Sequence, residues 1–230
     1  GGLGIALGAG GLAVGLRAAA RGFAEFDSSM TQSLAIMRDV NAEMRDEMVE
    51  AAREVAEEVN FAASETAEAY YFLASAGLDA QQSIAALPAV AEFARAGMFD
   101  LAQATDLATD AQSALGLTVQ DAQANLINLT RVTDVLVEAN RLANASVQQF
   151  STALTTEAGA ALKTFNKDVE EGLAVLAAFA DQGVKAQLAG SGLSRILRLM
   201  GSAAVNNAEA YRELGVTVFD ATGQMRNMAD

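Results

Sequence analysis

The sequence contains no cysteine and no histidine, and these two absences exclude several kinds of chemistry. Without cysteine the chain cannot form a disulfide. Zinc and the transition metals lose their two best side-chain ligands, and nucleophilic catalysis by a Ser–His or Cys–His pair within the chain is excluded. The acidic residues form no pair that stands apart from solvated helix faces. We therefore predict no catalytic, cofactor-binding or metal-binding residues and no enzymatic activity.

Aromatic residues and proline are also scarce. Aromatic side chains make up 6% of the 230 residues and proline occurs once, whereas 52% of the residues are apolar, with alanine the commonest of them. Alanine, leucine, glutamine and glutamate favour helices that pack closely through small side chains over a sandwich of β-branched residues. The composition predicts an all-α fold of short, capped helices.

Positive charge is in the minority. The chain has 15 Lys and Arg against 29 Asp and Glu, which gives a formal net charge of −14. Ten of the acids lie between residues 39 and 68, where they accompany only Arg45 and Arg53. Because an acidic surface repels phosphate and no basic patch is visible, we predict no stable binding of nucleic acid.

Residues 1–22 form an apolar segment rich in glycine and alanine, and its first sixteen residues carry no charge. That length is below the roughly 20 residues that span a membrane. The segment also lacks the basic start and the cleavage site of a signal peptide. Two interpretations stay open: a buried, partner-packed or flexible lead, or a membrane-active stretch. The candidates for membrane contact are Leu3, Ile5, Leu7, Leu12, Val14 and Leu16.

Residues 23–60 are acidic and are predicted to form one long amphipathic helix. Its apolar positions alternate in steps of three and four over about three and a half heptads, which is the spacing of a coiled-coil seam. Asn41 would be a polar interruption that fixes the register. The seam could join copies of the chain, or it could cover the protein's own core. Its members are Met30, Leu34, Met37, Asn41, Met44, Met48, Ala51 and Val55.

Residues 61–230 are predicted to form a helical core domain in which short helices end at glycines and restart at caps. Gly77 follows one such helix, and Asp79 with Gln82 has the pattern of a capping box for the next. Asp100 and Gln103 repeat this pattern. Further helices are expected over about 119–142, 147–162 and 168–180, and alternating residues near 216–225 favour a small β-hairpin. The spacing of helix ends varies, so the pattern does not indicate a solenoid.

Pro88 is the only proline, and it lies well inside the helix that Asp79 would cap. Proline at such a position removes a backbone hydrogen bond and disfavours helical geometry at the residue before it. We expect the helix to end near Leu87 and a further short helix to run from Pro88 toward Ala96. A kink within one continuous helix is the alternative.

Four stretches in this last segment, taken together and in order, resemble the core region of phage tail tape measure proteins. They are "AYYFLASAGLDAQQSIAALPAV", "DLAQATDLATDAQSALGL", "ADQGVKAQLAGSGLSRILRLM" and "ELGVTVFDATGQMRNMAD". The resemblance covers about residues 61–230 and is weaker over 1–60. In that first part only the general character of two features matches the family, namely the glycine-rich apolar lead and the stretch "FAEFDSSM". Gly192 departs from it, since the family often has alanine there. The signature positions are Gly77, Asp79, Pro88, Gly116, Gly183, Gly190, Gly215, Asp220 and Gly223.

The resemblance implies a structural protein that determines tail length, serves as a scaffold for assembly of the tail tube and is released during genome ejection. It implies three or six copies inside the tail tube or at its tip, in the virion, and a transient location in the host cell envelope. The implied partners are the tail tube protein, tail tip or baseplate proteins, tail assembly chaperones and the host membrane, with no cofactor. A membrane-perforating helical protein is the alternative. We also expect the chain to be part of a longer protein whose measuring length lies elsewhere.

Overall fold

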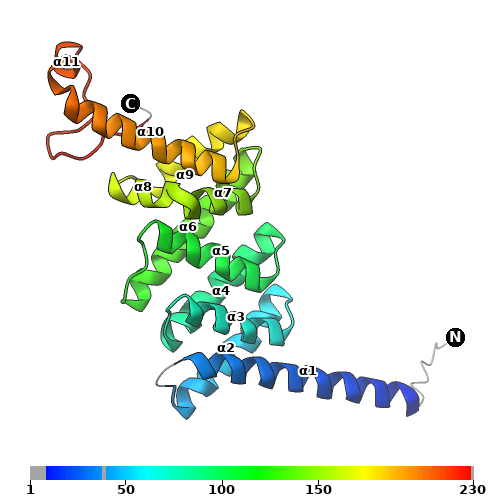
Figure 1. Ribbon diagram of the computed structural model, residues 1–230. Coiled ribbons are helices and arrows are strands. Elements are labelled where there is room, and N and C mark those ends of the chain that lie inside the picture. Colours follow the sequence, from blue (N-terminus) through cyan, green and yellow to red (C-terminus); the bar gives the residue numbers. More distant parts are fainter. Residues whose placement is uncertain (1–8, 38–39, 229–230) are drawn as a thin grey trace.

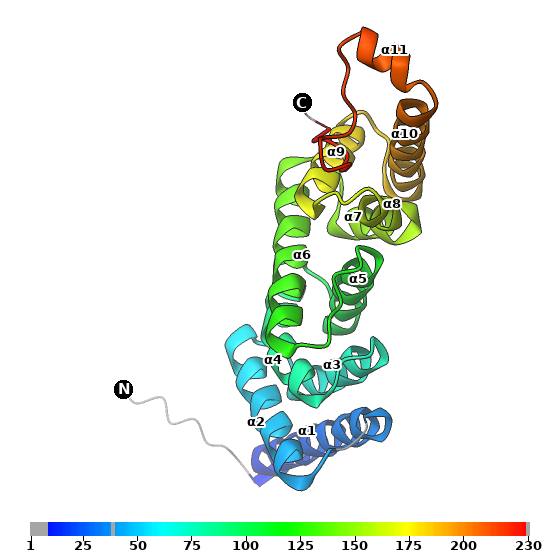
Figure 2. The same ribbon diagram turned by 90° about the vertical axis from the view of Figure 1, so that its left-hand side faces the viewer.

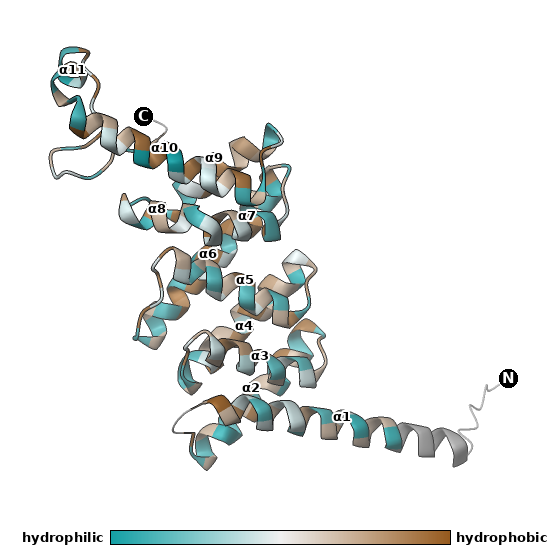
Figure 3. Ribbon diagram, viewed as in Figure 1, coloured by the Kyte–Doolittle hydropathy of each residue, from teal (hydrophilic) through white to brown (hydrophobic). Residues whose placement is uncertain are grey.

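The computed structural model describes residues 9–37 and 40–228. Helices account for most of these residues and no β-strand occurs among them, so the predicted all-α fold is confirmed. The helices lie in two rows that run side by side along an elongated stack (Figures 1 and 2). Hydrophobic and hydrophilic residues are mixed on each helix, as expected where one face is buried (Figure 3).

The two rows alternate along the chain. Most helices pack on their neighbours within their row and across to the other row. The first row consists of α1 (Ala9–Ile36), α3 (Ala63–Ser75), α5 (Leu101–Ala114), the continuous stretch of α7 (Val147–Ala153), a π-helical turn (Leu154–Ala158) and α8 (Gly159–Thr164), and α10 (Ala186–Asn206). The second row consists of α2 (Ala42–Val59), α4 (Ala80–Gly97), α6 (Ala122–Leu142) and α9 (Val169–Asp181). A short helix, α11 (Ala208–Glu213), follows α10.

This arrangement is that of an α-solenoid, in which stacked helix pairs contact only their neighbours. The sequence pattern did not indicate this arrangement. Helices of the first row range from 28 residues in α1 to 13 residues in α3, so successive units differ in length. Units of unequal length leave no fixed period in the sequence, which is why the stack could not be predicted from repeats.

Side-chain caps start several helices of both rows. The carboxylate of Asp79 accepts the backbone N–H of Gln82 at 2.8 Å, and the Gln82 side chain accepts the N–H of Asp79 at 3.0 Å, so the predicted capping box is confirmed. Asp100 accepts the N–H of Gln103 at 2.7 Å, again as predicted. Asp121 caps α6 in the same way, and α6 therefore begins at Ala122 and not near residue 119.

Glycines end several helices, as predicted. Gly77 follows α3 with a φ of +93°, and Gly116 follows α5 with a φ of +70°, a left-handed conformation that is least costly for glycine. Gly183 and Gly215 occupy the same conformation after α9 and α11. Gly77, Gly116 and Gly183 let the chain reverse and place the next helix in the other row, whereas Gly215 leads into the C-terminal loop.

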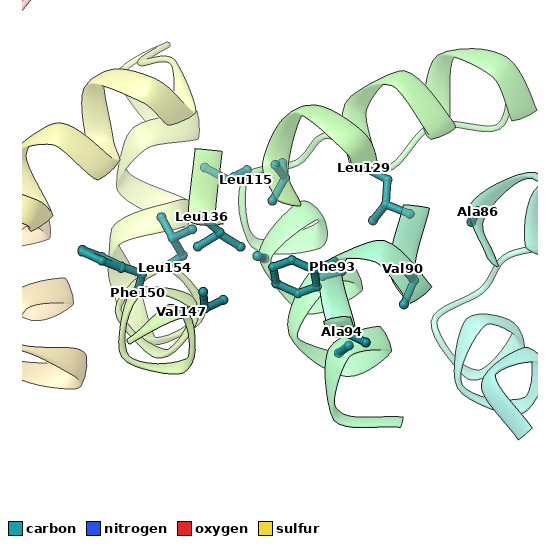
Figure 4. Close-up of a cluster of buried hydrophobic side chains, with 14 of the residues drawn as sticks. Ala86, Val90, Phe93, Ala94, Leu115, Leu129, Leu136, Val147, Phe150 and Leu154 are labelled. Carbon is teal, nitrogen blue, oxygen red and sulfur yellow. The ribbon is translucent and has the colours of Figure 1, made fainter. Parts of the chain in front are cut away.

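The core lies between the two rows and runs through the stack as one cluster of buried residues. Figure 4 shows Val90 and Phe93 of α4 near Leu129 of α6, and Leu136 farther along α6 near Leu154 in the next layer. Alanines fill many of the fully buried positions, which allows the helices to approach closely. Tyr70 is a much larger side chain that is also fully buried. Its hydroxyl donates to the carbonyl of Met48 at 3.1 Å, so the buried polar group is satisfied.

The single long helix predicted over residues 23–60 is wrong. One helix ends at Ile36 and the next begins at Ala42. Asn41 has an extended backbone, and its side-chain oxygen accepts the N–H of Met44 at 2.8 Å. It is therefore the N-cap of α2 and not a polar interruption within a seam. The first helix also begins earlier than expected, within the apolar lead, at Ala9.

The predicted helix end at Leu87 is also wrong. Helix α4 continues through Pro88 and ends at Gly97, so the helix is continuous, as the alternative had it. Leu87 and Val90 are buried on either side of Pro88, whereas Pro88 itself is exposed. Packing of both halves of α4 on the core stabilises the helix despite the hydrogen bond that proline cannot form.

The predicted hairpin near 216–225 is reduced to one antiparallel bridge between Phe219 and Met225, without strands. The carboxylate of Asp220 accepts the backbone N–H groups of Thr222 at 2.8 Å and Gln224 at 3.0 Å, which organises the turn. The hydrogen bond from the Thr222 hydroxyl makes the largest contribution to lowering the pKa of Asp220 below its usual value, and the backbone N–H groups add to it. Gly223 has a φ of +84° in this compact turn, and backbone hydrogen bonds from Asp220 to Gln224 and from Arg226 to Val218 join its two arms.

Candidate interaction surfaces

The residues of the predicted seam face the protein's own core and are divided between two helices. Met30 of α1 and Met48 and Val55 of α2 are buried. Leu34, Met37, Met44 and Ala51 are partly buried, and Asn41 is exposed. Because α1 packs on α3, and α2 packs on α3 and α4, these side chains would have to leave the core to join another copy.

Half of the candidates for membrane contact fall outside the described residues, namely Leu3, Ile5 and Leu7. Leu12, Val14 and Leu16 belong to the first turns of α1, of which the structure describes the backbone only. This end of α1 extends beyond α3 (Figure 1). None of the helices described here combines the length and the apolar character needed to cross a membrane.

Phe23, farther along α1, is 66% exposed, and Arg53 of α2 covers part of it. The guanidinium carbon of Arg53 lies 5.9 Å from the centre of the Phe23 ring and 5.0 Å from that of Phe26. A cation in this position is attracted to the aromatic face. Arg53 therefore connects α1 to α2 at this end of the stack.

The opposite end of the stack presents an apolar surface on α10. Leu193 and Leu197 face inward and are fully buried, while Leu188 is 67% and Leu199 56% exposed. Ile196 and Met200 are also exposed, and two arginines accompany them on the accessible part of the helix. We name the set Leu188, Arg195, Ile196, Arg198, Leu199 and Met200 the α10 outer face.

A groove with an apolar floor lies between α6 and α9. We call it the α6–α9 groove; its floor consists of Val135, Ala139, Leu142, Leu173, Ala174 and Ala177, and its rim of Asp134, Glu138 and Glu170. Leu142 is 69% exposed at one end of this floor. Asp134 and Glu138 also border a second depression, between α6 and α4.

Two arginines hold rim carboxylates of this groove. Arg131 donates to both oxygens of Glu170 at 2.6 Å and to Asp168 at 3.2 Å. Arg141 donates to Glu138 at 2.7 and 2.9 Å. These hydrogen bonds hold the pKa values of Glu170 and Glu138 below the usual range, so both carboxylates are ionised at neutral pH. Asp134 forms no ion pair with any residue that the structure describes.

The C-terminal loop is fastened to the start of α9 by a buried ion pair. The ammonium of Lys167, whose side chain is 2% exposed, donates to the carboxylate of Glu171 at 3.0 Å. Lys167 also donates to the carbonyl of Arg226, and Glu171 accepts the backbone N–H of Met228. Sequence reasoning missed this connection, because Arg226 and Met228 lie more than fifty residues from Lys167 and Glu171 in the chain.

The remaining signature residues are structural. Gly190 lies inside α10, where a Cβ atom would stand 2.3 Å from the carbonyl oxygen of Ala153. Gly190 therefore allows α10 to approach α7 closely. Across the described ranges, no group of three or more Asp and Glu residues is positioned to hold a metal ion. The surfaces of this molecule suit protein contacts by shape, apolar area and charge.

Comparison with known families agrees with an interaction role. A family model described as "Phage-related minor tail protein" matches residues 49–230, from the middle of α2 to the end of the chain. The chain belongs to this family. As a phage minor tail protein it has a structural role in the tail and is a component of the virion. Searches of curated proteins and of solved structures found no match.

Both the α10 outer face and the α6–α9 groove lie within the part of the minor tail protein that the family model matches. Helix α1 precedes the matched residues. The family resemblance drawn from sequence stretches began at about residue 61, so the match extends it through the second half of α2. The helical stack from α3 onward therefore belongs wholly to the family domain.

Proposed function

We propose that this minor tail protein acts in tail length determination, as the core region of a tape measure protein. The observation that carries the proposal is the order of four sequence stretches that resemble tape measure proteins. All four lie within residues 49–230, which the minor tail family model matches. A single stretch would be weak support, whereas four in the expected order are hard to obtain by chance.

The fold bears on which part of such a protein would measure length. A continuous helix advances about 1.5 Å per residue. In the stack the helices of the first row cross the long direction, so the chain advances far less per residue than a continuous helix would (Figure 1). Residues 49–230 would then be a folded module of the tape measure, and continuous helical sequence in the same gene product would set the length.

The proposed partners follow from this role. Several copies, three or six, would associate with the tail tube protein, with tip or baseplate proteins and with assembly chaperones, inside the tube or at its tip. During ejection the protein would leave the tube and reach the host envelope. The net charge of −14 supports a place in the tube, because an acidic lining would not retain DNA that passes through it.

In-frame deletions in the gene that encodes this chain test the proposal, with tail lengths measured by electron microscopy. Removing helical sequence outside residues 49–230 should shorten tails by about 1.5 Å per deleted residue. Replacing the deleted sequence with an unrelated helix of equal length is the control and should restore the normal length. Deletions within residues 61–230 should abolish tail assembly and leave no short tails. Tails of unchanged length after the outer deletions would disprove the tape measure role.

A further inference from the structure

The α10 outer face is an apolar surface that no other described helix covers. Helix α1, the outermost helix at the other end of the described stack, is polar on the side opposite its buried face, where Arg21, Ser28 and Gln32 are exposed. On α10 the exposed residues are instead Leu188, Ile196 and Leu199, and none of the helices in residues 40–228 covers them.

The charges near this apolar face have one sign. Residues 182–208 contain Lys185, Arg195 and Arg198 and no acid, although the whole chain is strongly acidic. A partner for this surface should therefore offer an apolar strip bordered by carboxylates. Burial of the leucines would supply the driving force, and the arginines would select the partner and its orientation.

The same chain carries a surface of that description. The α6–α9 groove has an apolar floor, with Leu142 and Ala174 exposed, and a rim of Asp134, Glu138 and Glu170. Arg141 pairs with Glu138 and Arg131 pairs with Glu170, whereas Asp134 forms no ion pair among the described residues. Helix α2 is also acidic, but none of its exposed side chains is large and apolar, so it matches the charge and not the leucines. The groove matches both.

We propose that the α10 outer face of one copy docks in the α6–α9 groove of a second copy. Leu188, Ile196 and Leu199 cover the groove floor, and Arg195 and Arg198 lie against Asp134 and Glu138. The two surfaces differ, so the contact is heterologous: each copy can accept one neighbour and donate to another, and copies form a ring or an open chain. The inference rests on the proposed function in one respect, namely that several copies of the protein are present in one tail.

Reversal of charge on each surface tests the contact in the purified full chain. One variant carries Arg195→Glu with Arg198→Glu, and the other carries Asp134→Lys with Glu138→Lys. All four side chains are exposed, so the fold should persist, which circular dichroism checks. By sedimentation velocity each variant alone should self-associate at least about tenfold more weakly than the wild type, because like charges then face each other. An equimolar mixture of the two should recover association, since every contact in alternating copies pairs opposite charges.

A matched control is Glu54→Lys with Glu57→Lys on the exposed face of α2, which changes the net charge as much as the groove variant does. It should associate like the wild type. Leu199→Ser, which removes an exposed apolar side chain without altering charge, should weaken association as the charge variants do.

A wild-type chain that stays monomeric at all concentrations would overturn the proposal. So would charge variants that associate normally, a mixture that does not recover, or a surface that binds lipid vesicles and no second copy. Such results would leave tail length control untouched, because the deletion experiment measures it separately.

Discussion

At the scale of single residues, two glycines in one helix show how closely the stack is packed. A Cβ atom at Gly190 would stand 2.3 Å from the carbonyl oxygen of Ala153, a backbone atom that cannot move aside alone. Two residues later, a Cβ atom at Gly192 would meet only a ring carbon of Phe179, at 3.7 Å. Gly190 is therefore needed for the approach of α10 to α7, and Gly192 is not.

We predict opposite effects on stability from substituting these glycines. Gly190→Ala should lower the free energy of unfolding by about 1–3 kcal/mol, because the added methyl group overpacks the contact between α7 and α10. Gly192→Ala should raise it by about 0.5–1 kcal/mol, because alanine loses less conformational entropy than glycine in a helix. Urea denaturation of both variants measures the difference. Equal effects of the two substitutions would show that the close approach at Gly190 is not a constraint.

Local interactions decided which residues could be assigned from sequence. Asp79, Gln82 and Asp100 act as predicted, because a cap depends only on residues within one helical turn. Asn41 was misassigned because the steps of three and four continue across the corner between α1 and α2, so the pattern alone cannot reveal the break. The exposed arginines of α10 and the acids of the groove were visible as charges, but only tertiary packing brings them to their surfaces.

At the scale of helices, α4 shows that packing can override an unfavourable residue. Pro88 has no N–H to donate to the carbonyl of Ile84, one turn earlier. Residues on both sides of it, from Ser83 to Ala94, are nonetheless buried against α2, α5 and α6. Sequence rules for proline describe an isolated helix, and they failed here because the neighbouring helices were unknown.

Pro88→Ala should therefore stabilise the protein. The substitution restores a backbone hydrogen bond and removes the steric conflict of the ring, and Pro88 is exposed, so little packing is lost. We expect the free energy of unfolding to rise by about 1–3 kcal/mol, as measured by urea or thermal unfolding. Pro88→Gly is the matched control and should gain less, since glycine lacks the helix propensity of alanine. A loss of stability in Pro88→Ala would mean that the ring or a bend at this point contributes to the fold.

At the scale of the whole molecule, the two-row stack makes contacts almost entirely local along its length. Helices in the middle, such as α5, have neighbours on both sides, whereas α10 contacts only the last layers and no residue of α11 is buried. In such quasi-one-dimensional structures, stability is a sum over units and their nearest neighbours. The two ends should then open without unfolding the centre.

Amide hydrogen exchange of two matched variants tests this expectation. Leu73 in α3 and Leu197 in α10 are both fully buried leucines, one near each end of the stack. Truncating either to alanine should cost about 2–5 kcal/mol locally. Leu73→Ala should speed exchange in α1 to α5 and leave α9 and α10 protected, and Leu197→Ala should do the reverse. If each substitution instead speeds exchange evenly from α2 to α10, the stack unfolds as one cooperative unit, and a tail protein built on it could not open from one end.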